Sequence, residues 1–247
     1  MIALRSHELR KTYPGASQPA LTGLDLAVEE GEFFGLLGPN GAGKTTAISI
    51  FTGLRTPTSG SVSVFDRDLR AAGGEVRRRI GLVPQDIALY PTLSVRQNLE
   101  YFGRLYGLAG GELKRRIGEC LDRVALSETA DRPVETLSGG MKRRANLAAG
   151  LIHGPTLLFL DEPTVGVDAQ SRAAILTTLQ SLSQAGVTMI YTTHYLEEAE
   201  RLCGRVAIID GGRVLSEGAP VALIQQTPGC SNLEGVFLHL TGRELRD

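Results

Sequence analysis

Short runs of apolar residues alternate with helical patterns along most of the 247-residue chain. Several of these runs are continuously apolar, which is typical of strands buried on both faces of a sheet. The expected strands are residues 33–37, 62–65, 80–83, 157–160, 187–192 and 206–209, and the expected helices are residues 44–54, 171–185 and 197–202. This alternation predicts a largely parallel sheet with helices on both sides.

The stretch from about residue 94 to residue 151 differs, because it contains helical patterns and no convincing strand. A helical insertion within an α/β domain is the simplest interpretation. Near the end of the chain, Leu233, Val236, Phe237 and Leu240 are spaced as one apolar face of a short helix. We expect this face to pack on its own domain rather than on a partner.

Charge and cysteine content exclude several classes of protein. The 26 Lys and Arg residues are balanced by 27 Asp and Glu residues, whereas a general nucleic-acid binder normally carries a basic excess. Cys120, Cys203 and Cys230 form no metal-binding or disulfide pattern, which favours a reducing cytosol. The N-terminus has no signal-peptide run, and no segment approaches the about 20 apolar residues of a membrane span.

Residues 38–45, with the sequence GPNGAGKT, fit the phosphate-loop pattern GxxxxGK[ST] between an expected strand and an expected helix. Glycines let backbone N–H groups wrap a triphosphate, and the helix N-terminus directs its positive dipole end at the same phosphates. We expect Lys44 to lie along the β- and γ-phosphates and the Thr45 hydroxyl to bind Mg²⁺.

Two further segments carry candidate chemistry. The apolar run 157–160 ends in Asp161 followed by Glu162, at the sheet edge where open α/β sheets bind ligands. Asp161 is expected to hold Mg²⁺ through its water shell, and Glu162 to accept a proton from the attacking water. Upstream, the sequence LSGGM places Ser138 as the N-cap of a helix, which forms a second anion-binding surface.

Taken together, these motifs resemble the ATP-binding subunits of ABC transporters over nearly the whole chain. Residues 38–45 match Walker A, residues 137–141 the signature, and residues 157–162 Walker B with its catalytic acid. Gln85 in LVPQD matches the Q-loop, VGVD up to Asp168 the D-loop, and His194 in YTTH the switch histidine. The resemblance implies a P-loop NTPase core with a mostly parallel sheet, a small antiparallel β region and an inserted α-helical subdomain.

It also implies one ABC ATPase domain over residues 1–247. Residues 1–90 and 155–220 would form the nucleotide-binding core, residues 91–154 the helical signature subdomain and residues 221–247 a short tail.

Family roles can be assigned to the matching positions. The implied catalytic residues are Glu162, His194, which would contact the γ-phosphate and orient water, and Gln85, which would touch Mg²⁺ and the attacking water. The implied metal ligands are Thr45, Gln85 and Asp161. The implied ATP-binding residues are Tyr13, which would stack on adenine, with Gly38, Pro39, Asn40, Gly41, Ala42, Gly43, Lys44, Thr45, Thr46, Ser138, Gly139, Gly140, Asp161 and Asp168.

The resemblance further implies that the chain works as a pair. The signature of one subunit would contact the γ-phosphate bound by the other, so that a head-to-tail dimer buries two ATP molecules. The second subunit would be another copy or a paralogue, and a transmembrane permease would hold both at the cytoplasmic face of the membrane, with no nucleic acid involved.

Two departures from the commonest family pattern, Met141 in the signature and VGVD in the D-loop, resemble exporters of drugs, antibiotics and polysaccharides. We therefore expect an exporter of drug-like, antibiotic, lipid or polysaccharide substrates.

Other functions remain open at this stage. Repair ATPases of this type carry a long coiled coil between the Q-loop and the signature, and here only 51 residues intervene. Translation-associated members usually hold two such domains, and nutrient importers often add a C-terminal regulatory domain, for which the roughly 30 residues after Ala219 are too few. A GTPase lacks support because no NKxD motif is present, and a small-molecule kinase leaves the signature and His194 unexplained.

Overall fold

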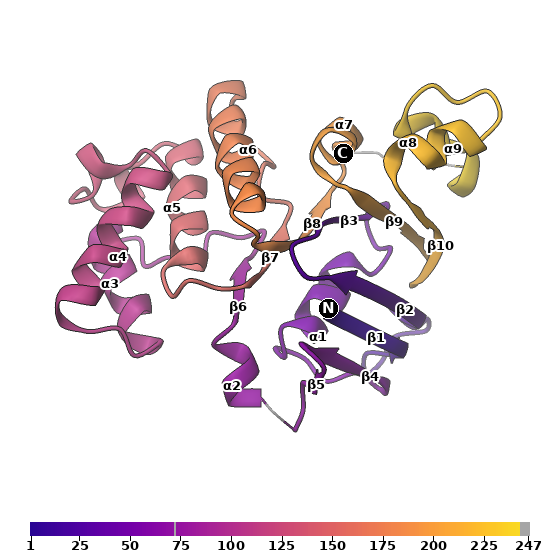
Figure 1. Ribbon diagram of the computed structural model, residues 1–247, viewed down its shortest axis with the longest axis horizontal. Helices are drawn as coiled ribbons and strands as arrows, with labels where there is room; N and C mark the ends of the chain where they lie inside the picture. Colours follow the sequence, from indigo (N-terminus) through magenta and orange to yellow (C-terminus); the bar gives the residue numbers. More distant parts are fainter. Residues whose placement is uncertain (72, 243–247) are drawn as a thin grey trace. The chain divides into compact units, whose positions relative to one another are not determined.

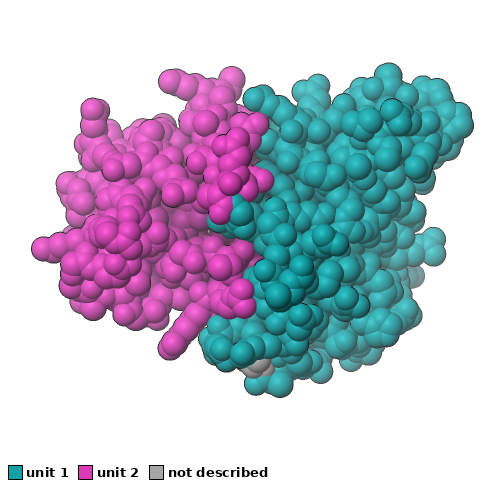
Figure 2. All heavy atoms as spheres, viewed as in Figure 1, with its two compact units in different colours: residues 1–77, 186–247 teal, residues 78–185 magenta. Residues whose placement is uncertain are grey.

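The computed structural model describes residues 1–71 and 73–242 and divides into two compact units (Figure 2). The first unit contains residues 1–77 and 186–247, and the second contains residues 78–185. Each unit has its own sheet pairings and its own buried residues. The prediction that the chain forms one domain with a helical part at 91–154 stays a prediction.

A small antiparallel sheet forms one part of the first unit, in the order β2-β1-β4-β5 (Figure 1). Its strands are β1 (Ile2–Lys11), β2 (Leu21–Glu29), β4 (Ser59–Val64) and β5 (Arg67–Asp68). The register between β1 and β2 shifts between Ser6 and Leu9, where Glu8 takes a positive φ of 45°. This irregularity is a bulge, which bends the strand and increases its twist.

The second sheet of this unit is built around β3 (Phe33–Leu37), whose five residues are all buried. Strand β3 pairs in parallel with β8 (Thr188–Thr193) and with β9 (Arg205–Asp210), and β10 (Arg213–Gly218) pairs antiparallel with β9. The helices of the unit are α1 (Lys44–Phe51), α2 (Gly73–Arg77), α7 (Leu196–Leu202), α8 (Pro220–Gln226) and α9 (Leu233–Thr241).

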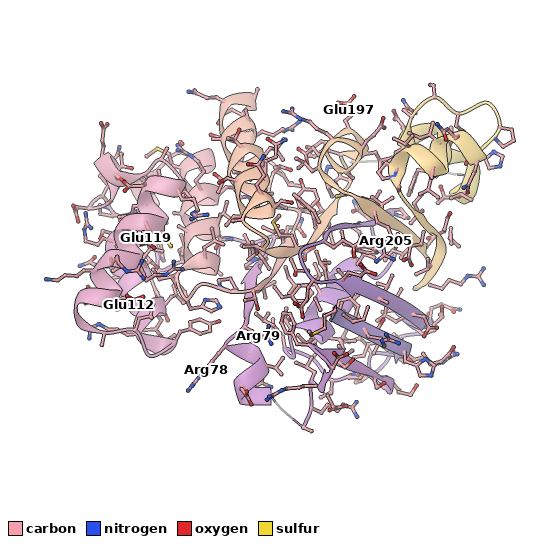
Figure 3. All side chains as sticks on the ribbon, in the orientation of Figure 1. Arg78, Arg79, Glu112, Glu119, Glu197 and Arg205 are labelled. Carbon is pink, nitrogen blue, oxygen red and sulfur yellow. The ribbon has the colours of Figure 1, made fainter. Side chains whose placement is uncertain are left out.

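Arg205 links the two sheets of the first unit (Figure 3). From β9 its guanidinium donates to the carbonyl oxygen of Ala27 on β2 at 2.6 Å and to Glu32 Oε1 at 2.7 Å. Hydrogen bonds from the guanidinium to Glu32 raise the pKa of Arg205, which therefore stays charged. Bidentate arginine–carboxylate pairs of this kind fix geometry as well as charge.

The second unit contains the parallel pair β6 (Ile80–Val83) and β7 (Leu157–Asp161) and a group of helices. These helices are α3 (Val95–Leu105), α4 (Gly110–Arg123), α5 (Gly139–Leu151) and α6 (Ala169–Gln184). Helix α3 begins with a capping box in which Ser94 and Gln97 exchange hydrogen bonds. Apolar faces of α3 and α4 are buried, which explains why this part of the sequence shows helical periodicity without strands.

Strand β6 and helix α5 approach each other through two glycines. A Cβ on Gly81 would lie 2.5 Å from the carbonyl oxygen of Gly150, and a Cβ on Gly150 would lie 2.7 Å from Val83 Cγ2. Neither position has room for a larger residue. The glycines therefore set the distance between this helix and its strand.

Most predicted elements are present with small differences in their ends. Helix α1 ends at Phe51 instead of residue 54, because Gly53 takes a positive φ of 74° and the Thr52 hydroxyl donates back to the Ile48 carbonyl. Helix α9 buries Leu233, Val236 and Phe237, as the spacing predicts, whereas the predicted fourth member of that face, Leu240, is exposed. The last residues of the predicted tail, 243–247, lie outside the described residues.

Among the helices of residues 1–71 and 73–242, none combines the length and the apolar composition needed to cross a bilayer.

The close packing at Gly81 can be tested by stability. Gly81→Ala should lower the free energy of unfolding by about 1–3 kcal/mol, because the new methyl group is forced onto backbone atoms. The matched control is Gly118 in α4, where a Cβ meets no described atom within 4 Å. Gly118→Ala should raise stability by about 0.5–1 kcal/mol, because alanine loses less backbone entropy in a helix. Urea denaturation measures both, and equal effects of the two substitutions would contradict this packing.

Candidate active site

The phosphate-loop residues 38–43 connect β3 to α1. Gly41 and Gly43 both have positive φ, 83° and 105°, in the region that glycine adopts without strain. A Cβ on Gly43 would lie 2.6 Å from the carbonyl oxygen of Ala20, and one on Gly38 would lie 2.5 Å from that of Ile209. These glycines are therefore required by close backbone approach, in agreement with their place in the predicted motif.

Lys44 begins helix α1 and is 5% exposed. Its ammonium group donates to the carbonyl oxygens of Gly38 at 2.7 Å and Pro39 at 3.1 Å, so the loop curves around the lysine head. Gly43 is the N-cap, and within the described residues no side chain caps this helix. An uncapped helix N-terminus next to an ammonium group fits an anion such as a phosphate group.

Tyr13 lies beside this helix, with its hydroxyl 3.3 Å from Thr46 Oγ1. Lys11 Nζ and Arg55 Cζ lie 5.3 Å and 5.4 Å from the centroid of the Tyr13 ring. An aromatic ring close to two cations, beside the helix that follows the predicted phosphate loop, suits a nucleotide, whose base stacks and whose phosphates are negative. Thr45, in the first turn of α1, is exposed.

His194 follows strand β8 in the same unit and is half-buried. In the parallel pair β3–β8, Thr193 is the register partner of Leu37, the residue before the phosphate loop. His194 and Gly38 therefore follow the carboxyl ends of neighbouring parallel strands. Ligands of open α/β sheets bind at this edge, so the structure places His194, the predicted switch histidine, on the side of the predicted phosphate loop.

Asp161 and Glu162 lie in the second unit, at the carboxyl end of β7, and both are buried. Glu162 has a positive φ of 49°, which is a strained conformation for a residue with a side chain. Such strain is concentrated at functional sites, where the surrounding structure holds the residue in place. Strand β7 thus ends at Asp161, as predicted, and the next residue, Glu162, is held in an unusual backbone conformation.

The Q-loop of the second unit is held by helix α5. The buried side chain of Asn146 accepts a hydrogen bond from Ala88 N at 3.1 Å and donates to the Pro84 carbonyl oxygen at 3.2 Å. Arg143 donates to the carbonyl oxygen of Gln85. Burial lowers the pKa of the Arg143 guanidinium, while the negative charges of Asp86 and Glu162 oppose that shift. Hydrogen bonds from Arg143 and Asn146 thus hold the backbone of this loop, and the side chain of Gln85 is exposed.

The signature and the D-loop meet in the second unit. Ser138 caps helix α5 by accepting from Met141 N at 3.3 Å, and Asp168 caps helix α6 by accepting from Ser171 N at 2.9 Å. A Cβ on Gly140 would lie 1.9 Å from Ser171 Oγ and 3.0 Å from Asp168 Oδ2. The hydrogen bonds from Ser171 hold the pKa of Asp168 below its usual range, so this carboxylate stays ionised at neutral pH.

The predicted site residues are thus distributed over two constellations. The first unit contains Tyr13, residues 38–46 and His194, and the second contains Gln85, residues 138–140, Asp161, Glu162 and Asp168. Sequence reasoning did not find Arg143 and Asn146. A signal for Asn146 was present, because a single polar residue among the small and apolar residues of 145–151 is expected to be buried with partners.

The geometry and the motifs agree with comparison to known proteins. Residues 21–165 match the ABC transporter family model, and the chain belongs to this family. It is an ABC-type ATPase with the P-loop cassette fold, an α/β fold with a mostly parallel sheet and a small antiparallel sheet, as the sequence predicts.

The names of individual relatives mention antibiotic resistance or export. The chain is 46% identical over 232 residues to the linearmycin resistance ATP-binding protein LnrL of Bacillus subtilis, covering 94% of this chain and 72% of that protein. It is 44% identical over 231 residues to the Nod factor export ATP-binding protein I of Cupriavidus metallidurans, covering 94% and 76%. A dimeric ATP-binding cassette with ADP and phosphate, in a post-hydrolysis state, matches with a TM-score of 0.81 at 28% identity, covering 87% and 98%.

The two signature glycines should respond differently to the same substitution. Gly140→Ala should destabilise the fold by about 1–3 kcal/mol, because its methyl group overlaps Ser171. Gly139→Ala should not lower the melting temperature, because a Cβ there meets no described atom within 4 Å. Differential scanning calorimetry measures both. A destabilised Gly139→Ala together with an unaffected Gly140→Ala would be the opposite of what this packing requires.

Proposed function

We propose that this chain is the ATP-hydrolysing subunit that energises an ABC exporter of drug-like, antibiotic, lipid or polysaccharide substrates. The observation that carries the proposal is the similarity, over 94% of the chain, to ATP-binding proteins named for linearmycin resistance and Nod factor export. The ATPase class is common to the family, whereas the direction of transport and the substrate class are the proposal.

The residues proposed to bind ATP lie in the first unit. The backbone of residues 38–43 and the N-terminus of α1 receive the phosphates, Lys44 neutralises the β- and γ-phosphates, and Tyr13 supplies the ring against which adenine stacks. The two loop carbonyls that Lys44 now contacts hold its ammonium group within the loop. Little reorganisation is then needed when phosphate oxygens approach.

Magnesium binding is proposed for Thr45, Gln85 and Asp161. Their hydroxyl, amide and carboxylate oxygens are hard donors of the kind that Mg²⁺ prefers. A bound Mg²⁺ neutralises charge on the β- and γ-phosphate oxygens. Asp161 lies at the carboxyl end of β7, the edge at which open α/β sheets bind their ligands.

Hydrolysis is proposed to depend on Glu162 and His194. Glu162 accepts a proton from the attacking water. Its positive φ restricts the direction in which its side chain extends from the main chain. His194 orients that water and contacts the γ-phosphate from its position beside the phosphate loop. Positioning and electrostatic stabilisation supply most of the catalysis in phosphoryl transfer, and a base or water-positioning residue orients the nucleophile.

The signature is proposed to bind the ATP held by a second subunit, which is another copy or a paralogue. Ser138 and Gly139 lie at the N-terminus of α5, where nothing described blocks the approach of an anion to Gly139. Asp168 would lie at the same interface through its contact with the signature. The dimeric cassette to which this chain is similar supports pairing. A transmembrane permease would convert closure and release of the pair into transport, at the cytoplasmic face of the membrane.

Lys44→Ala should weaken ATP binding by about 100-fold or more, because the site loses its buried positive charge. Lys114→Ala, an exposed lysine on α4, is the matched control and should bind as the wild type does. Isothermal titration with Mg·ATP measures both. Retained wild-type affinity in Lys44→Ala would contradict the phosphate-loop assignment.

Glu162→Gln should bind ATP and hydrolyse it at least about 100-fold more slowly, since the proton acceptor is lost while binding is retained. With ATP, the Glu162→Gln protein should then accumulate as a nucleotide-locked dimer. Size-exclusion chromatography with light scattering measures this dimer. Glu197→Gln, an exposed glutamate on α7, is the control. A Glu162→Gln protein that stays monomeric with ATP and still turns over would overturn the assigned role.

A further inference from the structure

His194 is the middle residue of a short turn between β8 and α7. The Thr193 hydroxyl accepts a hydrogen bond from Tyr195 N at 2.9 Å, which closes the turn on the side facing the strand. The rings of His194 and Tyr195 lie 4.2 Å apart, inclined by 44°. The hydrogen bond between Tyr195 and Thr193 therefore holds the backbone on both sides of His194.

Glu198 contacts both ends of this turn. Its Oε2 accepts hydrogen bonds from the Tyr191 hydroxyl and from the Thr193 hydroxyl, the latter at 3.2 Å. Its backbone N–H donates to the Tyr195 carbonyl oxygen at 3.0 Å. The Thr193 hydroxyl thus donates to Glu198 and accepts from Tyr195, so a continuous chain of hydrogen bonds links the residues before and after His194.

The chain of hydrogen bonds is anchored in the core of the first unit. Glu198 is 6% exposed, and Tyr191 is fully buried with its ring edge-on to Phe33 of β3 at 5.9 Å between centroids. Tyr191 is also the register partner of Gly35 on β3. Glu198 is therefore held by the same strand pair whose carboxyl ends carry the phosphate loop and His194.

We propose that Glu198 is a positioning residue for the reaction, which fixes the backbone of residues 193–195 and thereby directs the His194 ring. A buried carboxylate is costly compared with an apolar residue of similar volume, so stability alone does not favour it. Hydrogen bonds to a carboxylate are stronger than those between neutral groups, and they are directional. This inference rests on the proposed role of His194.

Steady-state phosphate release by the full-length chain tests the proposal. Glu198→Ala should lower kcat about tenfold or more, because a misdirected catalytic group loses its alignment with the water. The KM for ATP should stay within about twofold, because the phosphate loop and Tyr13 are unchanged. Glu197→Ala, on the exposed side of the same helix (Figure 3), is the matched control and should keep wild-type kcat.

Two conservative variants cover the case in which Glu198→Ala does not fold. Glu198→Gln keeps an oxygen acceptor and should retain part of the activity that alanine loses. Thr193→Val keeps the shape of the side chain but removes the hydroxyl that links Glu198 to Tyr195, and should also lower kcat. Melting temperatures measured alongside identify the folded variants.

The decisive measurement combines these changes with His194→Ala. A residue that acts through His194 has little left to affect once the histidine is gone, so adding Glu198→Gln or Glu198→Ala should change kcat by less than about twofold. Fully additive losses in the double variant would overturn the proposal, as would folded Glu198 and Thr193 variants with wild-type kcat. If His194→Ala alone keeps wild-type kcat, the proposed role of His194 fails, and with it the inference.

Discussion

The parallel pairing of β3 with its two neighbours is the constraint on which the nucleotide site depends. All five residues of β3 are buried, and the strand lies between β8 and β9. Because the three strands are parallel, their carboxyl ends meet at one edge, where Gly38 follows β3 and His194 follows β8. A shift of one residue in this register would reverse the side chains of β3 and move the phosphate loop away from the histidine.

A second feature of the fold is the close contact between glycines and neighbouring elements. Gly43 lies against the Ala20 carbonyl, Gly81 against that of Gly150, and Gly140 against Ser171. In each case the missing side chain allows a loop, a strand or a helix N-terminus to come nearer than a Cβ permits. Protein interiors are close-packed, so such contacts transmit displacement instead of absorbing it.

Much of the fold could be predicted from the sequence because its central strands are continuously apolar and the phosphate-loop motif is specific. Strand β3 has the predicted ends, and β7 ends at Asp161 as expected. The sequence pattern does not predict strand β1, because its alternation is interrupted at Glu8, where the register shifts. The pattern predicts an end of α1 that lies beyond the observed one, because the left-handed conformation of Gly53 depends on context rather than on periodicity.

The site residues could be named from motifs, but the groups that support them could not. Asn146 and Glu198 are polar residues on helices, and helical polar residues are usually exposed. Their burial depends on partners that are distant in sequence, as with Asn146 and Pro84, or on a local turn whose geometry the pattern does not encode. Periodicity shows which face of a helix is apolar and does not identify a hydrogen-bond partner.

The grip of α5 on the Q-loop has a mechanical consequence. The helix has 13 residues, a rod about 20 Å long. Its tip bears Ser138, and its flank holds the loop of Gln85 through Arg143 and Asn146. If α5 tilts as a rigid body, the Gln85 loop and Ser138 move together. A displacement of the loop is then transmitted to the N-terminus of the helix, and no other element has to move.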